Sequence, residues 1–380
     1  MSKALQRLVL AGGGHAHLAV LNALARDPLR DVEVTLVTPT PEQAYSGMLP
    51  GWIAGHYARP EIEIDLESLA RRANVTLLRD RIGAMDANRR CVAVSDRQQL
   101  QYDVLSLDVG SEIDTAWVET LGDRLLPLRP IAGFLERWPS MLATARGRPG
   151  YRLAVVGAGA GGIEVALAAR HAFDRERIDG AVCLVAPRAR FLAGHGPGVR
   201  RRAADWMRRA GVELHDGHAV GTSAGLLLPD GTRMSFDCVI AATGAAPPGW
   251  LERSGLRLDP QGYVAVDACH RSVSHSEVFA AGDVCSRADP HFARSGVHAV
   301  RAGPVLAANL AAALRGGRLR EYRPRRRSLY LLACGPRNAI VSWGNLSAGG
   351  KWAWWWKDRI DRGFIVRHSV APRTDDSGVP

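Results

Sequence analysis

The stretch YRLAVVGAGAGGIEVALAARHA, residues 151–172, decides the fold. Its apolar start predicts a strand that runs into a glycine turn and then directly into an amphipathic helix. Gly157, Gly159 and Gly162 stand at the G-x-G-x-x-G spacing. The first glycine permits a tight turn, the second lets backbone N–H groups approach a pyrophosphate, and the third lets the helix lie close on the strand. The stretch therefore predicts a dinucleotide-binding unit with its phosphates at the helix N-terminus.

An earlier copy of this pattern lies near the N-terminus. Residues 8–11 are apolar and lead into GGGHAH, residues 12–17, and then into a helical run that ends before Pro28. His17 stands at the third glycine position, so we expect either a helix that lies further from its strand or an imidazole that fills a specific gap. Two such units predict two bound nucleotides. The alternative is that both turns are only tight connections in an α/β protein.

Length and composition set the limits of the interpretation. The chain has 380 residues, of which 47% are hydrophobic, enough for two or three domains with a substantial core. Its 49 basic and 38 acidic residues give a net charge of +11. Only three of the basic residues are lysines, so the charge reflects an arginine-biased composition. Because no nucleic-acid reader motif accompanies the arginines, we expect no nucleic-acid partner.

The six cysteines are scattered singly, with no C-x-x-C pair. This spacing predicts no dithiol redox centre, no bound metal and no secreted disulfide framework. The N-terminus shows no signal-peptide pattern, and no uninterrupted apolar run reaches about 18 residues. We therefore expect a cytoplasmic protein.

The first unit continues with an alternating strand over residues 32–37 that ends at Thr38. An NAD-binding fold usually has an acidic residue there for the ribose, although Thr38 can still form one hydrogen bond. The loop YSGMLPG, residues 45–51, lies at the carboxyl end of this sheet and is expected to contact the ligand through Ser46, Gly47 and Met48. The alternative is that Met48 only fills the core under a turn. A later buried strand closes the unit at Gly110.

The second unit has its own departures from the NAD-binding pattern. Its second strand, residues 181–185, is followed by APRAR without a carboxylate for a ribose. Arg188 could pair with a 2′-phosphate, which favours NADPH over NADH, and the alternative is a simple surface arginine. Further along, one strand ends at Gly244, and another ends at Gly282 and Asp283. A helix is predicted over residues 294–314, with Gly296 and Val297 in its first turn.

Together these motifs resemble the two-dinucleotide-binding flavoprotein (pyridine nucleotide-disulfide oxidoreductase-like) superfamily. The chain is similar to the members related to type II NADH dehydrogenases and sulfide:quinone reductases. It is most similar to the subgroup found alone or fused ahead of selenophosphate synthetase, which carries the GGGHAH and YSGMLPG stretches. The resemblance implies an α/β glutathione-reductase-like fold with two Rossmann-like dinucleotide-binding domains, and it implies FAD and NAD(P)H as cofactors.

The resemblance also implies roles for individual residues. Glu164 matches an acidic residue that faces the nicotinamide and flavin region, so it is the candidate catalytic residue; the alternative is a buried carboxylate paired with an arginine. The candidate cofactor-binding residues are Gly12, Gly14, His15, Ala16, Thr38, Ser46, Gly47, Met48, Gly110, Gly157, Gly159, Gly162, Arg188, Gly244, Gly282, Asp283, Gly296 and Val297.

The implied domains are an FAD-binding domain in two parts, residues 1–128 and 263–325, an inserted NAD(P)-binding domain, residues 129–262, and a C-terminal segment, residues 326–380. The implied reaction transfers hydride from NAD(P)H to flavin and electrons to a second small acceptor, such as a quinone, without a redox disulfide. Two departures weaken the quinone assignment: Val297 and Arg301 replace a glutamine pair. Oxidation of a sulfur or selenium compound and a non-catalytic FAD-binding module stay open as alternatives.

The C-terminal stretch KWAWWWKDRIDRGF, residues 351–364, predicts an amphipathic helix. Trp352, Trp355, Trp356, Ile360 and Phe364 are expected on one stripe flanked by basic residues. Such a helix can lie in a membrane interface, which would make the protein peripheral on the inner face of the membrane. The alternative is that the stripe packs on the FAD-binding domain or on a second subunit in a homodimer.

Overall fold

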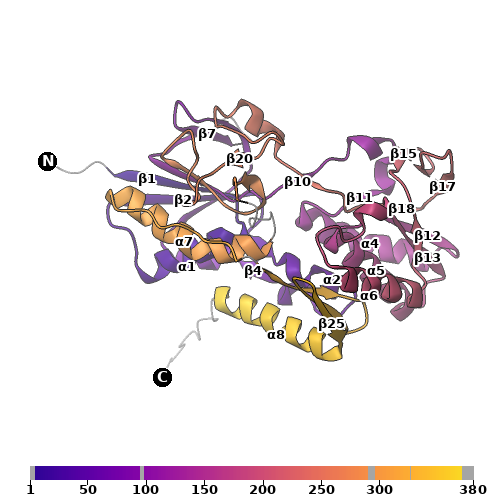
Figure 1. Ribbon diagram of the computed structural model, residues 1–380. Coiled ribbons are helices and arrows are strands. Elements are labelled where there is room, and N and C mark those ends of the chain that lie inside the picture. The colour runs from indigo at the N-terminus through magenta and orange to yellow at the C-terminus, as the bar shows by residue number, and fades with distance from the viewer. Residues whose placement is uncertain (1–4, 95–97, 290–295, 326, 370–380) are drawn as a thin grey trace, which may run out of the picture.

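In the computed structural model, residues 5–94, 98–289, 296–325 and 327–369 are described. They form two α/β units that lie side by side, with a C-terminal helix beneath both (Figure 1). Each unit is built on a five-stranded parallel sheet. The predicted fold class, two Rossmann-like units and a C-terminal segment, is confirmed.

The first sheet has the strand order β21-β9-β1-β2-β5. Its strands are β1 (Gln6–Ala11), β2 (Val32–Thr38), β5 (Thr76–Arg79), β9 (Val104–Leu107) and β21 (Val278–Ala280). Helices α1 (His15–Arg26), α3 (Leu66–Arg72) and α7 (Gly296–Arg315) cover one face, where they share an apolar core with Leu8, Leu10 and Leu36. The antiparallel sheet of β6 (Ile82–Asp86), β7 (Cys91–Val94) and β8 (Gln99–Gln101) covers the other face.

The second sheet has the strand order β11-β18-β12-β13-β14. Its strands are β11 (Leu125–Pro127), β12 (Tyr151–Val156), β13 (Gly180–Val185), β14 (Glu213–His215) and β18 (Cys238–Ala241). Helices α4 (Ile131–Arg146), α5 (Ala160–Arg175) and α6 (Pro197–Arg209) pack on one face. The small sheet of β15 (Val220–Thr222), β16 (Gly225–Leu227) and β17 (Arg233–Ser235) packs on the other.

The boundaries between the units differ from the expected ones. Strand β11 pairs with β18, and Val118 packs in the core of the second sheet, so the chain enters the second unit before the expected boundary at residue 128. Leu251 and Leu256 pack in the core of the first unit, so the chain returns before residue 263. The crossing is made by β10 (Glu112–Ile113), which pairs with β19 (Ala245–Ala246).

The C-terminal segment seals the junction of the two units. Strands β23 (Leu329–Ala333), β24 (Ala339–Trp343) and β25 (Leu346–Gly350) form an antiparallel sheet that leads into α8 (Lys351–His368). The start of α8 buries Ala353 and Trp354 in the core of the second unit, where the Trp354 ring contacts those of His56 and Tyr57 in the loop after α2 (Leu49–Ile53). The end of α8 buries Phe364 in the core of the first unit. The helix therefore packs on both units.

Among the described residues, α7 is long and apolar enough to cross a membrane. Eight of its residues are buried, and it packs along α1 in the core of the first unit, as the core helix of a protein in water does. The first two residues of the helix predicted over 294–314 lie outside the described residues.

Candidate functional site

The first glycine turn joins β1 to α1 at the carboxyl edge of the first sheet. Gly12 has a φ of +93°, and its N–H donates to the Val37 carbonyl over 2.8 Å. A side chain at Gly12 would collide with the Asp108 carbonyl, and one at Gly14 would collide with the Asp108 carboxylate. The turn therefore requires glycine at these two positions.

The N-terminus of α1 is capped by a side chain from the neighbouring strand end. Asp108 follows β9, and its Oδ2 accepts the N–H groups of Ala16 and His17 over 2.7 and 3.0 Å. Burial raises the pKa of this carboxyl to about 7, although the two N–H bonds act in the opposite direction. Sequence reasoning missed Asp108. The resemblance implied Ala16 as a cofactor-binding residue, and in this structure its N–H donates to Asp108.

His17 fills a specific gap, which is one of the two arrangements that the sequence predicts. The imidazole is fully buried, its Nδ1 lies 2.6 Å from the Gly12 carbonyl, and its Nε2 lies 2.8 Å from the Ser106 hydroxyl. Because a carbonyl only accepts, Nδ1 carries the proton and the hydroxyl donates to Nε2. Burial lowers the pKa of His17 to about 4, which keeps this neutral form.

Two polar atoms beside the first turn are buried and have no partner among the described residues: Asp283 Oδ1 and His15 Nε2. The other oxygen of Asp283 accepts from Arg129 over 2.7 Å. Burial lowers the pKa of His15 to about 4, so its ring is neutral. Buried polar groups are rarely left unpaired, so these atoms fit the hydroxyl or phosphate groups of a dinucleotide.

The remaining first-unit candidates surround the same edge. Thr38 is buried beside Gly13, and its hydroxyl donates to the Thr40 carbonyl over 3.2 Å. Ser46 lies near Gly296, which begins α7, and Gly110 and Gly282 have positive φ angles in the turns after β9 and β21. Val297 is half-buried in the first turn of α7.

Met48 does not lie where the resemblance implied. It is 1% exposed and packs in the apolar core that contains α5. Met48 therefore fills the core under a turn, as the alternative interpretation of the loop predicts. Gly47 is half-buried, and its carbonyl accepts from Lys357 over 2.6 Å.

The second glycine turn joins β12 to α5. Gly157 has a φ of +123°, and a side chain there would collide with the Ala242 carbonyl. A side chain at Gly162 would collide with the Gly157 carbonyl. Gly159 is the N-cap of α5, which has no side-chain cap, and the space around Gly159 and Gly244 is open. This helix N-terminus has free N–H groups for a phosphate.

One further atom supports a nucleotide at the second turn. The Thr243 hydroxyl follows β18 and is buried without a partner among the described residues. Next to the turn lies a pocket of about 290 Å³, lined by Ala158, Leu184, Phe191, Arg188, His215 and Asp216. Its apolar walls and polar rim fit the adenosine end of a dinucleotide.

Arg188 has a partner that sequence reasoning missed. Asp216 Oδ1 accepts the Arg188 N–H over 2.8 Å, and Oδ2 lies 3.4 Å from the guanidinium. The second strand of this unit carries no carboxylate at its end, but the third strand supplies one. Both charges therefore face the adenosine pocket.

A buried charge cluster lies where the two units and α8 meet. Lys357 Nζ donates to Asp361 Oδ2 over 2.6 Å, and Glu164 Oε1 accepts the Ala333 N–H over 2.7 Å. Burial raises the pKa of Glu164 to about 7, against the nearby Lys357 charge. Burial disfavours the Lys357 ammonium, but Asp361 and Glu164 outweigh burial and raise its pKa. Glu164 thus lies beside a lysine, whereas the sequence alternative expected an arginine.

A groove of about 880 Å³ runs between α1 and α7 and reaches the first turn. Its lining includes His15, Ala19, Val300, Pro304, Phe364 and Arg367. The His15 ring contacts those of Tyr45 and Phe364, at 5.5 and 5.9 Å between ring centroids. The lining also holds the charged side chains of Arg26, Asp27 and Arg72, so the groove is mixed in polarity, and it reaches the neutral imidazole of His15.

The stripe expected on α8 is only partly correct. Trp352, Trp355, Trp356 and Ile360 are exposed, at 53%, 60%, 41% and 41%, but Phe364 is buried at 2%. Trp354, which lies off the stripe, is also buried. The exposed apolar face of α8 is thus shorter than expected, because the helix rests on the first unit at its C-terminal end.

All six cysteines are free thiols. Cys334 lies nearest the charge cluster, where burial and the Glu164 charge raise its pKa. A thiol held in its protonated form is a poor nucleophile, so Cys334 is suited to packing.

Comparisons with known proteins agree with this geometry. The pyridine nucleotide-disulphide oxidoreductase family matches residues 6–303. The NADH dehydrogenase-like protein YutJ of Bacillus subtilis is 21% identical over 289 residues, 74% of this chain and 77% of that protein. The probable ferredoxin reductase CtmF of Castellaniella defragrans is 25% identical over 304 residues, 75% of this chain and 69% of that protein.

Among solved structures, the sulfide:quinone oxidoreductase from Aquifex aeolicus superposes with a TM-score of 0.78 at 16% identity, covering 97% of this chain and 93% of that one. This likeness concerns the fold. The family match spans both glycine turns and more than half of the chain. The chain therefore belongs to the pyridine nucleotide-disulphide oxidoreductase family, whose cofactors are FAD and NAD(P)H.

Proposed function

We propose that the protein is an FAD-dependent oxidoreductase that takes hydride from NAD(P)H and passes electrons to a second small acceptor, a quinone, without a redox disulfide. The observation that carries this proposal is the pair of glycine turns, one per unit, together with a buried charge cluster that joins Glu164 on α5 and Lys357 on α8, which also contacts Gly47 of the first unit. Bound FAD supplies the chemistry that accepts hydride and releases electrons.

The residues of the first unit would hold FAD. Asp283 and His15 offer unpaired buried atoms, and Gly12 and Gly14 allow the close approach of Asp108 that shapes the turn beside them. The residues of the second unit would hold NAD(P)H. The free N-terminus of α5 would bind its pyrophosphate, and Arg188 and Asp216 would face its adenosine.

Glu164 and Lys357 would set the charge where the two nucleotides meet. The buried ammonium compensates negative charge that hydride transfer brings to the junction. Glu164, with a pKa near 7, can hold or release a proton at working pH. The Gly47 carbonyl holds Lys357 in place over 2.6 Å.

The quinone would reach the junction through the groove between α1 and α7. Apolar residues of the groove, such as Ala19, Val300 and Pro304, would contact a quinone ring, and the groove reaches His15. The exposed tryptophans lie in the N-terminal half of α8, whereas the groove reaches the C-terminal end of this helix at Phe364 and Arg367. These tryptophans favour docking of α8 on a membrane surface, because indole rings prefer the headgroup region. Trp355→Glu should therefore reduce sedimentation with anionic vesicles severalfold, whereas Trp206→Glu on α6 should not. Equal binding by both variants would contradict the docking.

The function is tested with purified, FAD-loaded protein under anaerobic conditions. NADH or NADPH should bleach the flavin absorbance, and a soluble quinone should restore it. Bleaching by sulfide or selenide, but by neither nicotinamide, would instead favour oxidation of a sulfur or selenium compound. Flavin that no donor bleaches would show a non-catalytic FAD-binding module.

A further inference from the structure

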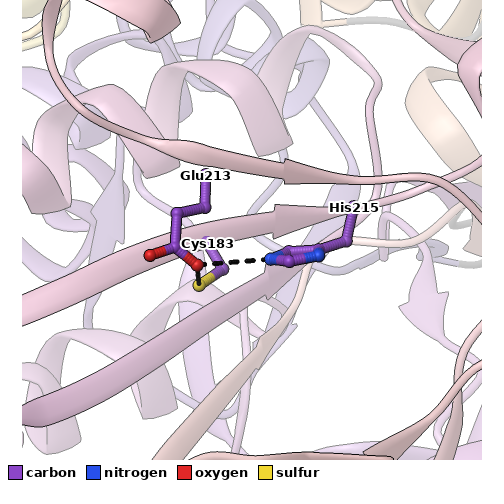
Figure 2. Close-up of side chains that lie close together, drawn as sticks. All are labelled: Cys183, Glu213 and His215. Carbon is purple, nitrogen blue, oxygen red and sulfur yellow. Dashed lines mark hydrogen bonds and ion pairs between the residues drawn. The ribbon is translucent and has the colours of Figure 1, made fainter. Parts of the chain in front are cut away.

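Three side chains of types that bind metals gather at the edge of the second sheet, next to the pocket beside the second glycine turn. Cys183 lies on β13, and Glu213 and His215 lie on β14 (Figure 2). Glu213 Oε2 accepts from the Cys183 thiol over 3.2 Å and lies 3.3 Å from His215 Nε2. The three ligand atoms all lie within 4.8 Å of one another.

The parallel pairing of the two strands creates this cluster. Cys183 pairs with Glu213, and Val185 pairs with His215. Because side chains alternate along a strand, Glu213 and His215 leave the same face of the sheet as Cys183. The sequence places 29 residues between Cys183 and Glu213, so no C-x-x-C spacing marks the site.

The two distances from the Glu213 oxygen fit a zinc-class ion. Zinc lies about 2.0–2.3 Å from nitrogen, oxygen and sulfur ligands, so neighbouring atoms of a tetrahedral site are about 3.3–3.6 Å apart. The measured 3.2 and 3.3 Å are close to these values. Cys183 is buried and Glu213 is exposed, so the fourth position can hold water on the solvent side.

We propose that Cys183, Glu213 and His215 form a binding site for a borderline-soft divalent cation such as Zn²⁺. The cation binds the Cys183 thiolate, one Glu213 oxygen and neutral His215 Nε2. The thiol proton leaves to solvent, and the two anionic ligands balance the charge of the cation.

The site lies beside the pocket next to the second glycine turn. His215 also lines the adenosine pocket, so a bound metal would hold one wall of that pocket in place.

The test is a Co²⁺ titration of the full-length, FAD-loaded protein, recorded as a difference spectrum. One equivalent of Co²⁺ should produce a thiolate-to-cobalt charge-transfer band, and Zn²⁺ should abolish it. Cys183→Ser should abolish the band. Glu213→Gln and His215→Ala change exposed or half-buried side chains and should weaken Co²⁺ binding by more than about 100-fold.

Cys269→Ser is the matched control, because Cys269 is a half-buried thiol in the first unit. This variant should keep the band. The proposal is wrong if no band forms, if the folded Glu213 and His215 variants bind Co²⁺ as the parent protein does, or if Cys269→Ser abolishes the band. None of these outcomes depends on transfer of electrons by the flavin.

Discussion

The two glycine turns have the same backbone and differ in the residue at the end of the neighbouring strand. Their N-cap residues, Gly14 and Gly159, have nearly identical angles, with φ of −67° and −70° and ψ of 173° and 174°. Each first glycine would clash with the carbonyl of the equivalent residue, which is Asp108 in the first unit and Ala242 in the second. The two turns thus share one backbone geometry, and the Asp108 side chain gives the first turn a carboxylate that the second turn lacks.

Because of this difference, we expect the N-termini of α1 and α5 to bind anions differently. The N-terminus of α1 already holds a carboxylate, so a second anion there meets repulsion unless Asp108 takes up a proton. The N-terminus of α5 holds no side-chain cap and can accept and release a phosphate freely. We therefore expect FAD binding to be linked to pH and NAD(P)H binding to be much less so.

The largest effects should follow from closing either turn. Gly12→Ala should abolish FAD retention, and Gly157→Ala should abolish NAD(P)H binding while FAD stays bound, because each new side chain strikes a backbone carbonyl. Gly133→Ala, which adds a side chain in open space on α4, is the control and should change neither. The measurements are flavin content and nicotinamide titration. Loss of FAD from Gly157→Ala would contradict two separate sites.

Completing the first glycine motif should weaken the protein. His17→Gly removes a buried ring and its bonds to Gly12 and Ser106, at a cost of about 2–4 kcal/mol. Thermal unfolding should show a Tm lower by about 5–10 °C. Ser106→Ala, which removes one bond, should have a smaller effect. A higher Tm for His17→Gly would show that the ring fills no necessary gap.

Removing the charge at the first turn should change the pH dependence of FAD binding. The folded pKa of Asp108 lies near 7, above its usual value, so the anion that repels FAD forms as pH rises through 7. Asp108→Asn should bind FAD about tenfold more tightly at pH 8 and equally at pH 5.5. Flavin fluorescence quenching measures this affinity. Asp103→Asn, which changes an exposed ion pair with Arg7, is the control and should keep the pH profile of the parent protein. If Asp108→Asn also kept the parent pH profile, repulsion between Asp108 and FAD would be contradicted.

The smallest effects should appear at the adenosine pocket. Asp216 neutralises Arg188, so Asp216→Asn should raise the preference for NADPH over NADH severalfold, and Arg188→Ala should lower it. The ratio of the two nicotinamide dissociation constants measures this preference. A ratio that neither change alters would place the 2′-phosphate away from this pair.

The sequence predicts the repeated unit because its glycines are needed for backbone geometry, which is local. It does not reveal Asp108, because a carboxylate about 90 residues from its helix acts only once β9 lies beside β1. The same reason hides Asp216 and Lys357, which meet their partners across strands and units. The helical period of α8 is visible in the sequence. The sequence does not show that the C-terminal end of α8 packs on the first unit, so Phe364 is expected on the exposed stripe but is buried.

The most direct test of the whole account is equilibrium binding of two nucleotides to one chain. Purified protein should bind one equivalent of FAD, and the FAD-loaded protein should then bind one equivalent of a non-reducing NAD(P)⁺ without release of flavin. Displacement of FAD by the second nucleotide, or failure of the chain to retain any flavin, would contradict two independent nucleotide-binding sites.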